Sequence, residues 1–130
     1  GLHYQRDPHA QGKLVRAVSG RILDVAVDVR ASSPTRGEWY ACELSNENGC
    51  QLWIPVGFAH GFLALTDHAV VEYRCTASYH PESEGSILWN DPDLDITWEP
   101  AGFVMPEGGA FLSEKDAIAP SLKAGGWPFK

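Results

Sequence analysis

Residues 14–30, LVRAVSGRILDVAVDVR, consist of two apolar stretches separated by Ser19-Gly20. The three valines after position 24 alternate with Asp24, Ala26 and Asp28, so the two sets lie on opposite faces of an extended chain. A Ser-Gly pair is typical of a turn. The segment therefore predicts two strands joined by a turn.

The rest of the chain also reads as short strands between turns. We expect further strands at 39–44, 51–54, 62–66, 69–76 and 86–89. Asn48-Gly49 suits a primed hairpin turn, and residues 66–68 are expected to form a tight link between two strands. Many short strands at regular spacing predict an all-β sandwich, jelly roll or small barrel.

The last third of the sequence has a different character. Residues 90–110 are rich in Asp, Pro and Gly, which predicts a long connector. Ser113 and Asp116 have the spacing of a capping box, so a short helix is expected to begin there and to stop before Pro120. With 130 residues and no internal boundary, we interpret residues 1–130 as a single domain.

Composition excludes several classes of partner. The formal net charge is −7, from 17 acidic and 10 basic residues, and no basic run is present. Nucleic acids and anionic membranes bind proteins through clustered Lys and Arg, so neither is an expected partner. No apolar run approaches the ~20 residues of a membrane-spanning helix.

The cysteines bear on the cellular compartment, and the first residue bears on whether the chain is a fragment. Three cysteines without CxxC spacing favour reduced thiols in a cytoplasmic protein rather than a disulfide framework. The chain opens at Gly1 rather than Met, directly into motif-like sequence. We interpret it as a fragment that lacks an N-terminal segment.

Two segments carry candidate site residues. In QLWIPVGFAHGF, residues 51–62, His60 stands between Ala59 and Gly61, and small neighbours would let another molecule approach its imidazole. On strand 69–76, alternation places Tyr73 on a face expected to point into the barrel, where its hydroxyl needs a partner or a ligand. A packed core histidine and a core tyrosine bonded to a backbone carbonyl are the structural alternatives.

Metal binding is the rival use of the histidines. The five histidines never form HxH or HxxxH, so the local signal for a metal site is weak, although three ligands could still converge in space. His68 and His80 have turn-like surroundings and are expected to be exposed.

Longer motifs identify a family resemblance. GLHYQ, GKLVR, DVAVDVR followed by SSPT, QLWIPVGFAHGF, EYRCTASYHPESEGSILWNDPDLDITW and LSEKD occur in the order found in dTDP-4-dehydrorhamnose 3,5-epimerases. The resemblance covers nearly the whole chain. It implies a cupin-type jelly roll (double-stranded β-helix barrel), cofactor-free catalysis and a homodimer. The implied reaction epimerises C3 and C5 of dTDP-4-dehydro-6-deoxy-D-glucose, on the route to dTDP-L-rhamnose.

The resemblance also implies roles for individual residues. His3 in GLHYQ resembles the base, Asp116 its carboxylate partner, Lys13 the cation beside the sugar oxygens and Tyr73 the proton donor. A substrate-binding set is implied in addition to Lys13: Asp24, His60, Tyr79 (stacked on thymine), Glu84 and Lys115.

The chemistry of these residue types suits the reaction. Histidine titrates near working pH, a carboxylate fixes its tautomer, and a cation stabilises an enolate oxygen. Several alternatives stay open: epimerisation of a single carbon, a shift of the keto group, an idle nucleotide-sugar-binding fragment, and a metal-dependent cupin oxygenase.

Overall fold

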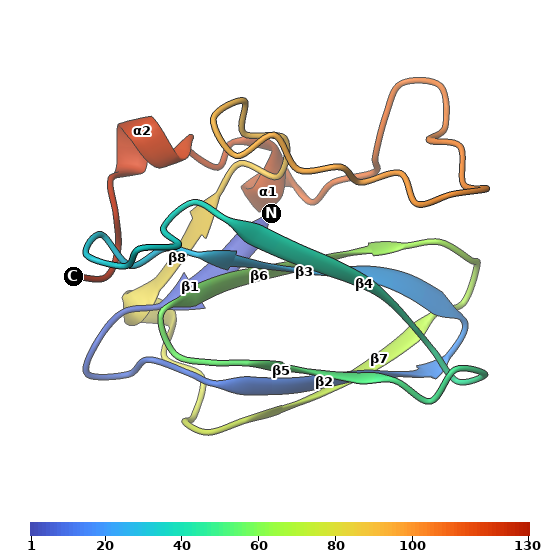
Figure 1. Cartoon of the computed structure of the whole chain (residues 1–130), viewed down its shortest axis with the longest axis horizontal. Coiled ribbons are helices and arrows are strands. Elements are labelled where there is room, and N and C mark those ends of the chain that lie inside the picture. Colours follow the sequence, from blue (N-terminus) through green and yellow to red (C-terminus); the bar gives the residue numbers. More distant parts are fainter.

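Two antiparallel sheets face each other in the computed structural model, which describes residues 1–130 (Figure 1). The first sheet has the strand order β4-β3-β6-β1-β8, and the second has the order β5-β2-β7. The strands are β1 (Leu2–Gln5), β2 (Lys13–Ser19), β3 (Arg21–Asp28), β4 (Trp39–Ser45), β5 (Gln51–Ile54), β6 (Phe58–Ala64), β7 (Val70–Cys75) and β8 (Glu84–Ile87). The expected all-β jelly roll is confirmed.

Strand β3 lies inside the larger sheet, between β4 and β6, and is buried on both faces. Its valines pack into a core with Leu94, Trp98 and Leu122 from the C-terminal segment, whereas Ile22 and Ala26 pack between the sheets. Full burial of one such aliphatic side chain contributes about 1.5–3 kcal/mol. The alternation predicted for this strand is therefore correct, and both of its faces are covered.

Three strand predictions differ from the structure. Strand β1 (Leu2–Gln5) was not expected, although its apolar residues Leu2 and Tyr4 alternate with His3 and Gln5. Strand β6 begins at Phe58 rather than at 62, since the turn signalled by Pro55 already ends at Gly57, whose φ is 93°. Strand β8 covers Glu84–Ile87 rather than 86–89.

The Asn48-Gly49 segment is not a primed hairpin turn. A type I′ turn needs positive φ at both central residues, and here Gly49 has φ 62° whereas Asn48 is not in the left-handed region. Strands β4 and β5 also belong to different sheets, so the segment crosses between layers. The Asn48 side chain stabilises the crossing by accepting from the Ser45 backbone N–H at 3.1 Å. The turn at residues 66–68 likewise connects the two sheets rather than forming a hairpin.

The C-terminal segment lies over the outer face of the larger sheet (Figure 1). The predicted short helix is present as α1 (Glu114–Ala117), and the Ser113 hydroxyl accepts from the Asp116 backbone N–H at 3.2 Å. A second short helix, α2 (Leu122–Gly125), was not predicted; it begins with a similar cap at Ser121. A 3₁₀ turn at Pro81–Ser83 precedes β8. None of the helices has the length and apolar character needed to cross a membrane.

Candidate active site

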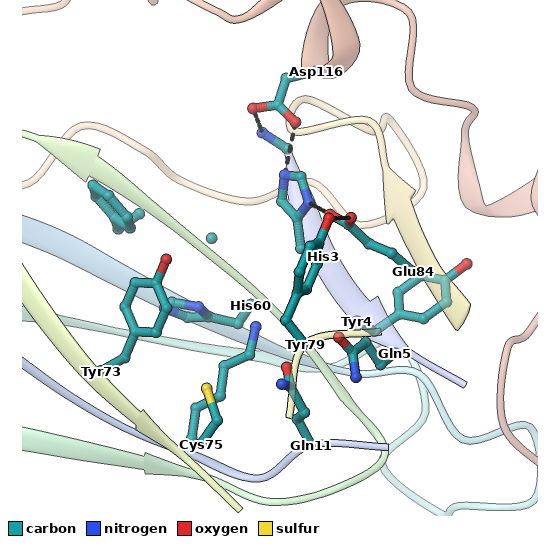
Figure 2. Close-up of a pocket in the computed structure, with 14 residues that line it drawn as sticks. His3, Tyr4, Gln5, Gln11, His60, Tyr73, Cys75, Tyr79, Glu84 and Asp116 are labelled. Carbon is teal, nitrogen blue, oxygen red and sulfur yellow. Dashed lines mark hydrogen bonds and ion pairs between the residues drawn. The ribbon is translucent and has the colours of Figure 1, made fainter. Parts of the chain in front are cut away.

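A cleft of about 570 Å³ opens between the two sheets (Figure 2). Strands β1 and β6 of the larger sheet and β2 and β7 of the smaller sheet form its walls, and β8 and α1 contribute to its rim. Seven of the predicted site residues line it: His3, Lys13, His60, Tyr73, Tyr79, Glu84 and Asp116. The other two lie next to the wall: Asp24 lies behind His60, and Lys115 is bonded to Glu84 at the rim.

His3 and Asp116 form a direct pair although they are 113 positions apart. The His3 Nε2 atom lies 2.7 Å from Asp116 Oδ1, and the Gly1 nitrogen lies 3.2 Å from Oδ2. Burial acts to raise the pKa of Asp116, but the neighbouring imidazole of His3 lowers it, and the pKa stays below its usual range. Asp116 is therefore ionised at neutral pH.

Glu84 contacts the other nitrogen of the same imidazole. Its Oε1 atom lies 3.1 Å from His3 Nδ1 and 2.6 Å from Lys115 Nζ, and Oε2 accepts from the Tyr79 hydroxyl at 2.7 Å. Burial acts to raise the pKa of Glu84, but hydrogen bonds from Lys115, Tyr79 and His3 lower it to about 2. Three residues expected to contact a nucleotide sugar thus form one cluster with His3.

His60 forms a second imidazole–carboxylate pair, deeper in the wall. Its Nε2 atom lies 2.6 Å from Asp24 Oδ1, with side-chain exposures of 6% for His60 and 0% for Asp24. The second oxygen of Asp24, Oδ2, is buried without a hydrogen-bond partner. Asp24 therefore faces inward beside His60 rather than toward solvent.

Lys13 and Tyr73 approach the cleft from the smaller sheet. Lys13 on β2 is paired in register with Cys75 on β7, and Tyr73 with Val15. Burial lowers the pKa of Lys13, although the acidic groups of Cys75, Glu84 and Asp24 partly oppose this shift. The Tyr73 hydroxyl has no protein hydrogen-bond partner, and the ring is 54% exposed toward the cleft (Figure 2). The alternative of a core tyrosine bonded to a backbone carbonyl does not hold.

The site and the fold agree with what sequence comparison finds. The family model for dTDP-4-dehydrorhamnose 3,5-epimerase matches residues 1–124. The chain belongs to this family. A curated dTDP-4-dehydrorhamnose 3,5-epimerase from Salmonella typhimurium is 54% identical over 122 residues, which are 94% of this chain and 63% of that relative. The chain thus spans less than two thirds of the length of the curated epimerase.

Solved structures of the epimerase family share the fold. A dTDP-6-deoxy-D-glucose-3,5-epimerase from Legionella pneumophila, in complex with dTDP-4-keto-L-rhamnose, is 50% identical with a TM-score of 0.85, covering 95% of this chain and 62% of that one. A 3'-monoepimerase from Streptomyces bikiniensis, in complex with dTDP-quinovose, is 38% identical with a TM-score of 0.84, covering 95% and 60%. The fold of this chain is therefore similar both to a 3,5-epimerase and to a 3'-monoepimerase.

Sequence reasoning missed several residues that line the cleft of this family member. Gln5, Gln11, Phe62 and Cys75 line it but were not singled out. Alternation on β7 already placed Cys75 on the face of Tyr73, so that signal was available. Gln5 gave no signal, because it lies on the unexpected strand β1.

The glycine beside His60 also has a structural purpose that was not expected. A Cβ on Gly61 would lie 2.5 Å from the Gly1 carbonyl oxygen and 3.2 Å from Leu2. The small residue therefore admits strand β1, whose residue His3 is paired in register with His60. Gly61 also lines the cleft beside His60.

The remaining histidines lie outside the cleft. His68 is exposed as expected, with φ 57° in the turn between β6 and β7. The expectation that His80 is exposed is wrong: it is half-buried and stacks on His9 with ring centroids 3.6 Å apart. No group of three or more His, Cys, Asp or Glu side chains is arranged to hold a metal ion.

Proposed function

We propose that this protein epimerises C3 and C5 of dTDP-4-dehydro-6-deoxy-D-glucose to give dTDP-4-dehydro-L-rhamnose. The observation that carries the proposal is the pairing of His3 with Asp116 at 2.7 Å in the cleft that Tyr73 also lines. On one wall, His3 of β1 supplies a basic side chain. On the other wall, Tyr73 of β7 supplies an acidic hydroxyl. A sugar ring between them would meet the two groups from different sides.

The reaction needs only proton transfers at carbons next to a ketone. His3 takes the proton from C3 or C5, and the electron pair of the broken C–H bond moves into an enolate with its charge on O4. Asp116 steadies the imidazolium that forms. Lys13 lies where a cation can stabilise the enolate oxygen. Tyr73 then delivers a proton to the opposite face of the same carbon, which inverts the centre.

The remaining residues support recognition of the nucleotide sugar. The Tyr79 ring is 65% exposed at the rim, which suits stacking on thymine, and its hydroxyl is fixed by Glu84. Lys115 supplies a cation at the same rim, and His60 supplies a polar group in the wall. We assign binding roles to Tyr79, Glu84, Lys115, His60 and, through His60, to Asp24.

We further propose that the protein acts as a homodimer in the cytoplasm. The three free cysteines suit a reducing compartment. Exposed large side chains such as Trp53 and Val70 on the strands offer apolar surface to a second copy.

The test is the reaction in heavy water, followed by proton NMR of the product. We expect deuterium at both C3 and C5, and the coupling pattern of the L-rhamno configuration. No exchange at either carbon would overturn the proposal. Calorimetric binding of thymidine diphosphate without exchange would instead establish an idle binding domain.

A second candidate is epimerisation at a single carbon. The likeness to a 3'-monoepimerase, at 38% identity and a TM-score of 0.84, favours it as the alternative. The same cleft and the same pair of side chains serve one inversion as well as two. Inversion and deuterium confined to one centre would decide for this alternative.

A further inference from the structure

Both ring nitrogens of His3 are occupied by carboxylates. Nε2 lies 2.7 Å from Asp116 Oδ1, and Nδ1 lies 3.1 Å from Glu84 Oε1. All three side chains are largely shielded, with exposures of 27% for His3, 20% for Asp116 and 16% for Glu84. Figure 2 shows the imidazole between the two acidic groups.

The protonation state of His3 follows from the number of donors this arrangement requires. An ionised carboxylate only accepts hydrogen bonds, and a neutral imidazole has only one N–H to donate. The lowered pKa values of Glu84, about 2, and of Asp116 keep both acids ionised at neutral pH. Only the imidazolium, with two N–H groups, satisfies both contacts.

An imidazolium has no lone pair with which to take a proton from carbon. Asp116 alone leaves one nitrogen free to act as a base, but Glu84 occupies that nitrogen. We propose that Glu84 is a positioning residue that holds His3 protonated in the free protein and must leave Nδ1 before His3 becomes a base. The consequence for catalysis rests on the proposed epimerase function.

The surroundings of Glu84 offer a way to release it. Its carboxylate is also held by Lys115 and Tyr79, whose side chains lie at the exposed rim. A diphosphate at this rim would compete for the Lys115 ammonium and repel the Glu84 carboxylate. Both effects move Oε1 away from Nδ1. The other charged or titratable groups near His3 are Asp116, the Gly1 nitrogen and His60 across the β1–β6 pair.

The first test observes the histidine rings by ¹⁵N NMR in the free protein at pH 7. His3→Asn identifies the signals of His3 by their loss. We expect both His3 nitrogens to be protonated in the wild type and only one in Glu84→Gln, because a glutamine amide can donate to a bare Nδ1. Glu82→Gln removes the same charge at an exposed position and should match the wild type. A neutral His3 in the wild type, or no change in Glu84→Gln, overturns the proposal.

The second test measures kcat/KM for solvent exchange at pH 6 and pH 8, because kcat/KM reports the protonation state of the free protein. Removal of the carboxylate beside Nδ1 leaves the base neutral in a larger share of the free protein at the lower pH. The ratio of kcat/KM at pH 6 to kcat/KM at pH 8 should rise about 10-fold in Glu84→Gln and stay at the wild-type value in Glu82→Gln. An unchanged ratio in Glu84→Gln contradicts the proposal. If the wild type shows no exchange at all, the epimerase function fails, whereas the NMR result still decides the role of Glu84.

Discussion

His3 on β1 lies directly opposite His60 on β6, and each imidazole is hydrogen-bonded to a carboxylate from a different element. The partner of His3 comes from the short helix α1, and the partner of His60 comes from the neighbouring strand β3. The exposed fraction separates the two pairs, because His3 is 27% exposed whereas His60 is 6% exposed. Only the His3 pair is exposed enough to exchange a proton with a molecule bound in the cleft.

Asp116→Asn should slow solvent exchange at C3 and C5 by about 10²–10⁴-fold, since the amide no longer stabilises an imidazolium and selects a different tautomer. Rates of deuterium incorporation measure the effect. Asp67→Asn, at an exposed turn position, is the matched control and should retain the wild-type rate. An Asp116→Asn rate equal to that of the control would remove Asp116 from the mechanism.

Tyr73→Phe should separate exchange from inversion. His3 would still remove a proton and return a deuteron from its own side, so the substrate gains deuterium while inversion is blocked at one centre or more. Proton NMR of the sugar distinguishes the two events. Tyr40→Phe changes a 62% exposed tyrosine on β4 outside the cleft and should leave both unchanged. Full inversion at the wild-type rate in Tyr73→Phe would rule out its role as the donor.

Asp24→Ala should lower the free energy of unfolding by about 3 kcal/mol, because it breaks a buried pair and leaves the His60 ring without its partner. Urea denaturation measures the loss. Asp67→Ala, in the exposed turn, should change stability by no more than about 0.5 kcal/mol. If both variants behave alike, the buried pair contributes nothing to stability.

Local sequence patterns predicted most strands because alternation and turn residues act over a few positions. The valines of β3 and the cap at Ser113 are examples, and both appear as expected. Strand β1 was missed because an alternation of only four residues is a weak local signal, and its partners β6 and β8 are distant in the sequence. Local alternation does not show which sheet a strand joins either: residues 45–50 look like a hairpin but cross between layers.

The site was predictable mainly through its motifs. His3, Tyr73 and Asp116 were chosen from separate motifs, and the fold brings them to one cleft. What the motifs did not contain was the contact pattern among them. Nothing in the spacing of His3, Glu84 and Lys115 indicates that one carboxylate would bond both of the other residues. Such contacts depend on the register of β1 against β8, where Gln5 is paired with Glu84.

The Asp28 carboxylate should make stability depend on pH in the acidic range. Hydrogen bonds from Arg30 lower its pKa well below the ordinary 3.8, against the effect of burial, and Ser33 and Thr35 add to the lowering. A folded-state pKa below the unfolded one stabilises the protein above pH 3.8, and that contribution is lost as the pH falls toward the folded-state value.

The comparison of Asp28→Asn with the wild type isolates this contribution. Thermal unfolding at pH 7 should show the variant to be less stable, and the difference should shrink steadily below pH 4, where the wild-type carboxylate loses its advantage. A difference that stays constant between pH 7 and pH 2.5 would mean that the hydrogen bonds of Asp28 do not favour its charged form.

The whole account depends on a neutral imidazole near the start of the chain removing a proton from a carbon beside the ketone. The direct measurement is deuterium uptake from heavy water at C3 and C5 of the 4-keto sugar, in the wild type and in His3→Ala. We predict uptake at both carbons in the wild type and at neither in His3→Ala. Uptake in His3→Ala at the wild-type rate, at either carbon, would contradict the assignment of His3 as the base.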